Sequence, residues 1–148
     1  MDNQPMNFMI MNNKIFRHTQ IYLDKALKKY GLSSGSFRYL FTLEQKEGIC
    51  QNEISARIGN DKAMSTRIIQ KLEESGFLLR QPDAKDNRAY QLFLTDKGKE
   101  VIPKVRSEIN LLQEKMTKDL TEDEKSQLLK SLYKVFCNTC KENITGGK

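Results

Sequence analysis

One face of a helix predicted over residues 62–75 mixes cationic, amide, hydroxyl and small side chains. The residues on and beside that face are Lys62, Ala63, Thr66, Arg67, Gln70 and Lys71. An arginine such as Arg67 can donate two hydrogen bonds to O6 and N7 of guanine, and Gln70 can pair with N6 and N7 of adenine. Lys62 and Lys71 suit phosphate contacts, which fix register without reading sequence. This mixture could read a DNA groove, although most polar helix faces are simply solvated.

A second group of charges lies between two strand-like runs. The runs 77–80 and 90–94 are largely apolar, whereas the stretch 81–89 is rich in charge and nearly free of apolar residues. Such a hairpin gains little by burial, so we expect Arg88 at its tip to enter the narrow, electronegative minor groove. Asp86 could orient the Arg88 guanidinium or hold the turn, and a local surface ion pair is the simpler alternative. The cations that we assign to nearby phosphates are Arg80 and Lys85.

Short local signals predict the elements that hold these groups in place. A short helix starts at residues 50–53, with Glu53 positioned for a capping box. The tight turn 59–61 follows, and Asp61 caps the next helix, which Gly76 stops. The inner face of that second helix carries Ser65, Ile68, Ile69 and Leu72. Two helices joined by so short a turn match a helix-turn-helix, and the hairpin after them makes it a winged one.

Helical patterns also fill the N-terminal part of the chain. Apolar residues at near-heptad spacing over residues 8–30 indicate a long first helix, which Gly31 ends. Ser33 or Ser34 can cap a second helix that runs up to Gly48. We therefore expect a mainly α-helical protein with a two-stranded wing.

The C-terminal third predicts two more helices. Thr95 caps a long helix whose apolar stripe covers residues 102–116. Thr121 and Glu124 form a capping box for a last helix, with apolar positions over residues 128–136. The stripes at both ends of the chain could cover each other within one chain, but helices of this length are hard to bury in so small a domain. We favour a homodimer with two-fold symmetry.

Length and composition set the broad class. The 148 residues suffice for one domain with a real core, and the net charge of +6 and pI of about 9.2 fit a polyanionic partner, although many soluble proteins are equally basic. Residues 1–11 lack the basic segment and the long apolar run of a signal peptide or membrane span. Three cysteines are an odd number without framework spacing, as expected in a reducing compartment. We expect a cytoplasmic protein without a membrane partner.

The motifs together resemble the MarR family of bacterial winged-helix regulators, named for multiple antibiotic resistance. The stretches that carry the resemblance are 51–55, 61–62, Arg67, 72–78, 86–89 and 94–98. The combination of Asp-x-Arg at residues 86–88 with Leu-Thr-x-x-Gly at residues 94–98 is fairly specific. Ser65 departs from the family pattern, in which a bulkier apolar residue is common at this position.

The resemblance implies a fold and a function. Residues 1–148 would form one MarR-like domain, with a winged-helix DNA-binding lobe at 32–98 and dimerisation helices at 6–31 and 99–144. It implies a homodimer that binds a pseudo-palindromic operator on double-stranded DNA as a repressor or, less often, an activator. It also implies an effector crevice between the dimer helices and the DNA-binding lobe.

Side chains on the first two predicted helices could line that crevice. They are His18, Tyr22, Arg38 and Tyr39. Aromatic and basic groups would suit a phenolic or carboxylate effector, although core packing and surface exposure are the ordinary roles of such residues. No phosphate loop, plausible catalytic triad or metal-ligand cluster stands out, so we expect neither an enzyme nor a bound cofactor or metal ion.

The cysteines leave alternatives open. Cys50 lies at a predicted helix start, where the pKa of a thiol can be lowered, so a redox-sensing regulator is one alternative to a buried or capping cysteine. Cys137 and Cys140 have the spacing of a thiol redox enzyme, but they lie toward the end of a helix instead of at a helix start after a strand. A winged-helix domain that contacts only proteins is the remaining alternative.

Overall fold

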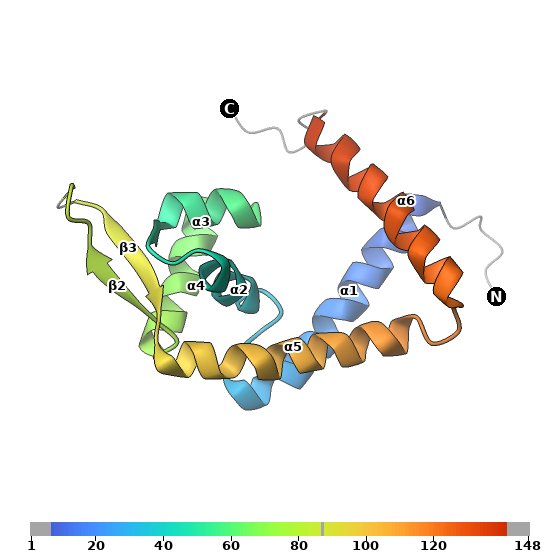
Figure 1. The fold of residues 1–148 in the computed structure, drawn as a ribbon, viewed down its shortest axis with the longest axis horizontal. Coiled ribbons are helices and arrows are strands. Elements are labelled where there is room, and N and C mark those ends of the chain that lie inside the picture. The colour runs from blue at the N-terminus through green and yellow to red at the C-terminus, as the bar shows by residue number, and fades with distance from the viewer. Residues whose placement is uncertain (1–6, 87, 142–148) are drawn as a thin grey trace. The chain divides into compact units, whose positions relative to one another are not determined.

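The computed structural model describes residues 7–86 and 88–141, and it is mainly helical, as predicted (Figure 1). The helices are α1 (Phe8–Leu27), the 3-10 helix η1 (Lys28–Tyr30), α2 (Phe37–Gln45), α3 (Gln51–Ile58), α4 (Lys62–Glu74), α5 (Asp96–Met116) and α6 (Glu122–Lys141). The strands are β1 (Ile49–Cys50), β2 (Leu78–Pro82) and β3 (Tyr90–Leu94). The chain divides into two compact units, residues 1–112 and 113–148. None of the described helices combines the length and apolar character that crossing a membrane requires.

The first unit has one apolar core, to which the helices α1 to α5 and all three strands contribute. Fully buried side chains in it include Leu27, Leu40, Ile54, Ile69, Leu92 and Val105. Within this unit α2 contacts α3 and β3, and α4 contacts α3 and β2. The helix-turn-helix is therefore fixed on one side by α2 and on the other by the sheet.

The ends of the first helix follow local signals. The Asn7 side chain accepts a 3.0 Å hydrogen bond from the backbone N–H of Ile10 and so caps α1. Gly31 ends the helical stretch as predicted, in a left-handed conformation with φ of 73°, which glycine adopts without steric cost. The last turn tightens into η1 before it.

The predicted cap of the second helix is wrong. α2 begins at Phe37, directly after Ser36, instead of after Ser33 or Ser34. The Ser36 hydroxyl is used inside the preceding turn, where it accepts from the backbone N–H of Ser33 at 2.8 Å and donates to the Ser33 carbonyl at 3.1 Å. Ser33 and Ser36 therefore form a local turn that competes with helix capping.

The sheet has three antiparallel strands in the order β1-β3-β2, so the two predicted wing strands, β2 and β3, are confirmed and a third strand that was not predicted joins them. β1 adds Ile49 and Cys50 beside Leu92 and Gln91 of β3. Gly48, with φ of 74°, turns the chain into this strand, and the Ile49 side chain is buried. Two residues are too few to show the alternation that marks a strand in a sequence.

A close backbone contact joins the wing to α5. Thr95 caps α5, since its hydroxyl accepts from the backbone N–H of Gly98 at 3.0 Å, and it also donates to the Gly76 carbonyl at 2.6 Å. The Thr95 N–H donates to the Phe77 carbonyl at 3.1 Å. A Cβ atom at residue 98 would collide with that same Phe77 carbonyl oxygen. The Leu-Thr-x-x-Gly motif therefore encodes a junction in which only glycine fits.

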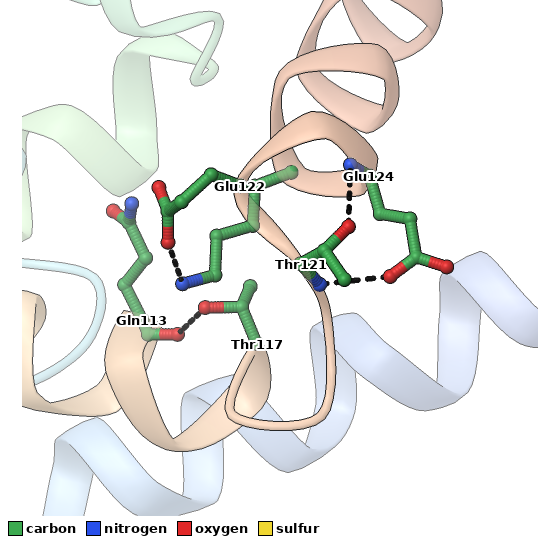
Figure 2. A network of polar contacts seen from close by, with 6 residues as sticks. Gln113, Thr117, Thr121, Glu122 and Glu124 are labelled. Carbon is green, nitrogen blue, oxygen red and sulfur yellow. Dashed lines mark hydrogen bonds and ion pairs between the residues drawn. The ribbon is translucent and has the colours of Figure 1, made fainter.

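The second unit contains the capping box predicted at the start of α6 (Figure 2). The backbone N–H of Thr121 donates to Glu124 Oε2 at 2.8 Å, and the Glu124 N–H donates to Thr121 Oγ1 at 3.3 Å. Thr117 closes the preceding helix by donating to the Gln113 carbonyl at 2.9 Å. α6 therefore has a well-defined start, even though none of its residues 122–140 is buried.

Candidate nucleic-acid interface

The turn between α3 and α4 has the geometry of a helix-turn-helix. Gly59 is left-handed with φ of 80°, and its N–H and that of Asn60 both donate to the Ser55 carbonyl, at 2.9 and 3.2 Å. The Asp61 carboxylate then accepts from the backbone N–H of Met64 at 2.8 Å and starts α4. Three residues thus connect the two helices, and the N–H groups of the first two bond back to the end of α3.

The two faces of α4 are divided as the sequence predicts. Ser65, Ile69 and Leu72 are buried on the inner face, and Ile68 is half-buried. The predicted contact residues are all exposed, namely Lys62, Ala63, Thr66, Arg67, Gln70 and Lys71. α4 therefore presents an exposed cationic and amide surface opposite its packed side.

Part of that exposed face is already ordered by side-chain contacts. The Thr66 hydroxyl donates to the Lys62 carbonyl at 2.8 Å and receives a hydrogen bond from Gln51 Nε2. Gln70 Nε2 donates to Glu74 Oε1 at 3.0 Å, a contact that would compete with a base for the same amide. Gln51 lies beside the predicted surface but was not predicted as a contact, because nothing in the sequence places the start of α3 next to Thr66.

Acceptor side chains hold the tip of the wing. The Asp86 carboxylate accepts from the backbone N–H of Arg88 at 2.9 Å, so it holds the turn, and the side chains of both residues are exposed. Asp83 accepts from the Lys85 N–H at 2.7 Å and from Gln91 Nε2 at 3.2 Å. The hydrogen bond from the Lys85 backbone holds the pKa of Asp83 below its ordinary value. Asn87, part of the Asp-x-Arg motif, lies outside the described residues.

Arg80 lies deeper than the other predicted contacts. Its Nε atom is 3.0 Å from Glu73 Oε2, an ion pair in which the N–H is not aligned for a hydrogen bond. Its side chain is 28% exposed. The pair joins β2 to the last turns of α4, so Arg80 supports the position of the wing besides carrying charge.

Three of the predicted cations meet at one surface depression of about 290 Å³. Lys62 comes from α4, Arg80 from β2 and Arg88 from the wing tip, and Gln51 lines the same depression. Cations from three separate elements thus line one depression. This arrangement suits a phosphate backbone that passes between a helix and a wing.

A second hollow, of about 470 Å³, lies between α4 and the end of the first helical stretch. Its cationic lining residues are Lys28, Arg67 and Lys71. Three serines, Ser33, Ser36 and Ser75, add hydroxyl groups to it.

The predicted effector residues have different environments. His18 on α1 and Arg38 on α2 are exposed, and Tyr22 on α1 is half-buried. Tyr39 is fully buried, with its hydroxyl hydrogen-bonded to Ser65 and Asn60. Tyr39 therefore belongs to the core of the helix-turn-helix and presents no surface to a ligand.

Cys50 lies directly before α3, but its side chain makes no capping hydrogen bond. The predicted capping role of Glu53 is also not seen, since its carboxylate binds Lys46 at 3.0 Å and Arg57 at 2.9 Å. These contacts, with Lys46 the larger, lower the pKa of Glu53. The short strand β1 fixes the entry to α3 instead, so the helix start does not depend on a capping box.

The other two cysteines lie on α6, where Cys137 is half-buried and Cys140 is exposed. A hydrogen bond with Cys137 raises the pKa of Tyr133. Within the described residues, no group of three or more histidines, cysteines or acidic residues is placed to hold a metal ion.

Known proteins support the class that the geometry defines, a winged-helix DNA-binding protein. The pattern of the MarR family matches residues 32–90. The HTH-type transcriptional regulator BilQ of Clostridioides difficile (strain CD3) is 30% identical over 132 residues, which cover 89% of this chain and 88% of the relative. The transcriptional repressor MprA of Escherichia coli (strain K12) is 31% identical over 125 residues, covering 80% of this chain and 71% of the relative.

Solved structures support the same class of protein. The crystal structure of a MarR transcriptional regulator from Methanosarcina mazei Go1 superimposes with a TM-score of 0.82 and 34% identity, over 87% of this chain and 93% of the other. The chain belongs to the MarR family of transcriptional regulators, and it is a DNA-binding regulator of transcription.

Proposed function

We propose that the protein is a repressor that binds a pseudo-palindromic operator as a homodimer, with α4 in the major groove and the wing beside it. The observation that carries the proposal is the shared depression in which Lys62, Arg80 and Arg88 meet. It brings cations from the start of the exposed α4 face and from the wing tip to the same depression. The relative MprA, described as a transcriptional repressor, supports repression as the direction of control.

Within this proposal the residues divide by role. Arg67 and Gln70 read base edges, while Lys62 and Lys71 contact phosphates and Ala63 and Thr66 allow close approach of the α4 backbone. Arg88 enters the minor groove, with Lys85 and Arg80 near phosphates. Asp86 holds the turn that presents Arg88, as its 2.9 Å contact with the Arg88 N–H supports.

Exposed apolar side chains support the homodimer. On α1, Phe8, Met9, Phe16 and Ile21 are each about half exposed. On α6, Leu129, Tyr133 and Phe136 are more than half exposed. Such residues on helices are costly in water, and a second copy of the chain would cover them. The two-fold symmetry would then place two α4 helices about 34–36 Å apart, as successive major grooves require.

A small effector is the proposed regulator. His18, Tyr22 and Arg38 on α1 and α2 offer aromatic and cationic groups for a phenolic or carboxylate compound. The 470 Å³ hollow lined by Lys28, Arg67 and Lys71 adds a second cationic surface of suitable size. A ligand that prefers another spacing of the two reading helices would shift the population toward it and change operator affinity.

Selection of bound sequences from random duplexes, repeated at two salt concentrations, tests the proposal. We expect an enriched motif with two inverted half-sites centred about 10 base pairs apart, and an affinity that falls steeply with salt. Enrichment of no sequence, or of a single unrepeated half-site, would contradict the dimeric reading of an operator. An affinity insensitive to salt would contradict the contribution of the lysines and arginines to binding.

A further inference from the structure

A polar chain runs through the core of the helix-turn-helix. The hydroxyl of Tyr39 lies 2.9 Å from Ser65 Oγ, and it receives a 2.9 Å hydrogen bond from Asn60 Nδ2. Tyr39 and Ser65 are both fully buried. The three residues come from α2, from the turn before α4 and from the inner face of α4. We call them the Tyr39 network.

The chemistry of the groups fixes the direction of one of these two hydrogen bonds. The Asn60 amide nitrogen can only donate, so the Tyr39 oxygen accepts from it. Between the Tyr39 hydroxyl and Ser65 Oγ either group can donate. The chain links Asn60, Tyr39 and Ser65, and it supplies a partner to polar groups that burial would otherwise make costly.

This network constrains α4 in a way that its apolar contacts do not. Ile69 and Leu72 are buried apolar side chains, and the hydrophobic effect that holds them is non-directional. A hydrogen bond weakens steeply once its distance or angle changes. Ser65 also lies nearly opposite Arg67 around α4, because two residues correspond to about 200° of helix rotation. A rotation that breaks the Ser65 contact would therefore displace the Arg67 side chain.

We infer that the Tyr39 network is a positioning element that sets the rotation of α4 and thereby the base preference of the protein. The inference rests on the proposed function, in which α4 is the reading helix. It explains the small hydroxyl residue at position 65, since a larger apolar side chain would meet the Tyr39 hydroxyl. Tyr39 thus acts through Ser65 on the exposed face, without touching DNA.

The test separates positioning from stability with the double variant Tyr39→Phe/Ser65→Ala. Tyr39→Phe alone leaves both the buried Ser65 hydroxyl and the half-buried Asn60 amide without this partner, whereas the double variant leaves only the Asn60 amide so, and its melting temperature should therefore stay closer to wild type than that of Tyr39→Phe. On the duplex selected by the wild-type protein, we expect affinity to fall by about tenfold or more and discrimination between bases under α4 to weaken. Wild-type affinity and preference in the folded double variant would overturn the inference.

Asn60→Ala provides a second variant that leaves the fully buried pair in place. It removes the donor from the half-buried turn and should shift base preference in the same direction as the double variant. An unchanged preference in Asn60→Ala would also overturn the inference, including where the double variant does not fold. Tyr30→Phe is the matched control. It deletes a tyrosine hydroxyl outside the network, which donates a 3.4 Å hydrogen bond to Glu108 of α5. An equal shift in this control would show that the effect is not specific to the network.

Arg67→Ala distinguishes failure of the positioning inference from failure of the proposed function. If it loses base discrimination while the network variants keep it, the proposed function stands and the positioning inference fails. If Arg67→Ala binds like wild type, α4 is not the reading helix, and the inference fails with that proposal.

Discussion

The Asp86 carboxylate accepts a 2.9 Å hydrogen bond from the backbone N–H of Arg88 at the tip of the wing. Asp86 therefore holds the turn, although its negative charge by itself would repel DNA. The two effects predict opposite outcomes for substitution, and this makes Asp86 a sensitive test of the role of the wing.

Asp86→Ala should weaken operator binding, because the turn that presents Arg88 loses its acceptor. Asp86→Asn should bind as well as wild type or better, since an amide oxygen can keep the same contact and a negative charge is removed. Titration of both variants against one operator duplex by fluorescence anisotropy measures this. Operator binding by Asp86→Ala that is stronger than wild type would show that the charge of Asp86 affects binding more than the turn that it holds.

Arg67→Ala and Arg88→Ala should change DNA binding in different ways. Loss of a base-reading arginine should cost about 1–3 kcal/mol of binding free energy and relax base preference at one position of each half-site. Loss of Arg88 should weaken binding with less change in major-groove preference. Repeating the selection of bound duplexes with each variant checks this, and identical motifs from all three proteins would contradict the assigned roles.

Gly98→Ala should destabilise the fold, because its Cβ would collide with the Phe77 carbonyl oxygen. Backbone atoms cannot move aside as a flexible side chain can, so we expect a cost of about 3 kcal/mol, toward the upper end for overpacking. Urea unfolding measures it. Gly35→Ala is the matched control, because a Cβ there meets no atom within 4 Å. Equal stability of the two variants would contradict the account of the Leu-Thr-x-x-Gly motif.

Leu132→Gln should weaken self-association. Leu132 is 44% exposed on α6, and in the proposed dimer a second copy of the chain would bury the exposed part of this apolar side chain. Fully burying a leucine contributes about 1.5–3 kcal/mol, so burying the exposed 44% of Leu132 should contribute roughly half of that, and a two-fold dimer contains it twice. Sedimentation equilibrium of Leu132→Gln and of the exposed control Lys130→Gln compares the two. Equal association constants would argue against α6 as a dimer surface.

Asp83 should stay ionised at lower pH than an ordinary aspartate does. The hydrogen bond from the Lys85 N–H lowers its pKa in the folded protein below the unfolded value, so its stabilising effect is complete above the unfolded pKa. That effect is lost only as pH falls through the lower, folded pKa. A carboxyl ¹³C NMR titration should place its midpoint below the ordinary aspartate value of about 3.9. A midpoint at or above that value would contradict the wing geometry described here.

Most of the architecture is predictable because its signals are local. Asp61, Thr95 and the pair Thr121 and Glu124 each cap a helix through atoms three residues apart or fewer, and such contacts need no knowledge of the tertiary fold. The separation of polar and apolar faces on α4 follows in the same way from helix periodicity. These signals are enough to predict a helix-turn-helix and a hairpin.

The features that could not be predicted depend on long-range contacts. β1 exists because Ile49 and Cys50 meet a strand some forty residues later, and this strand makes the expected capping by Glu53 unnecessary. Tyr39 resembled a ligand-binding residue because the sequence does not show that it faces Ser65 and Asn60. The Ser36 hydroxyl forms hydrogen bonds with Ser33 inside the preceding turn, so it does not cap α2.

A double-mutant cycle between Arg67 and guanine tests the central claim most directly. Binding of wild type and Arg67→Ala would be measured on operator duplexes in which each guanine in turn is replaced by 7-deazaguanine, which lacks the N7 acceptor. We predict that replacement at one position per half-site weakens wild type by about tenfold and leaves Arg67→Ala unaffected. Replacements that weaken both proteins equally at every position would contradict base reading by α4.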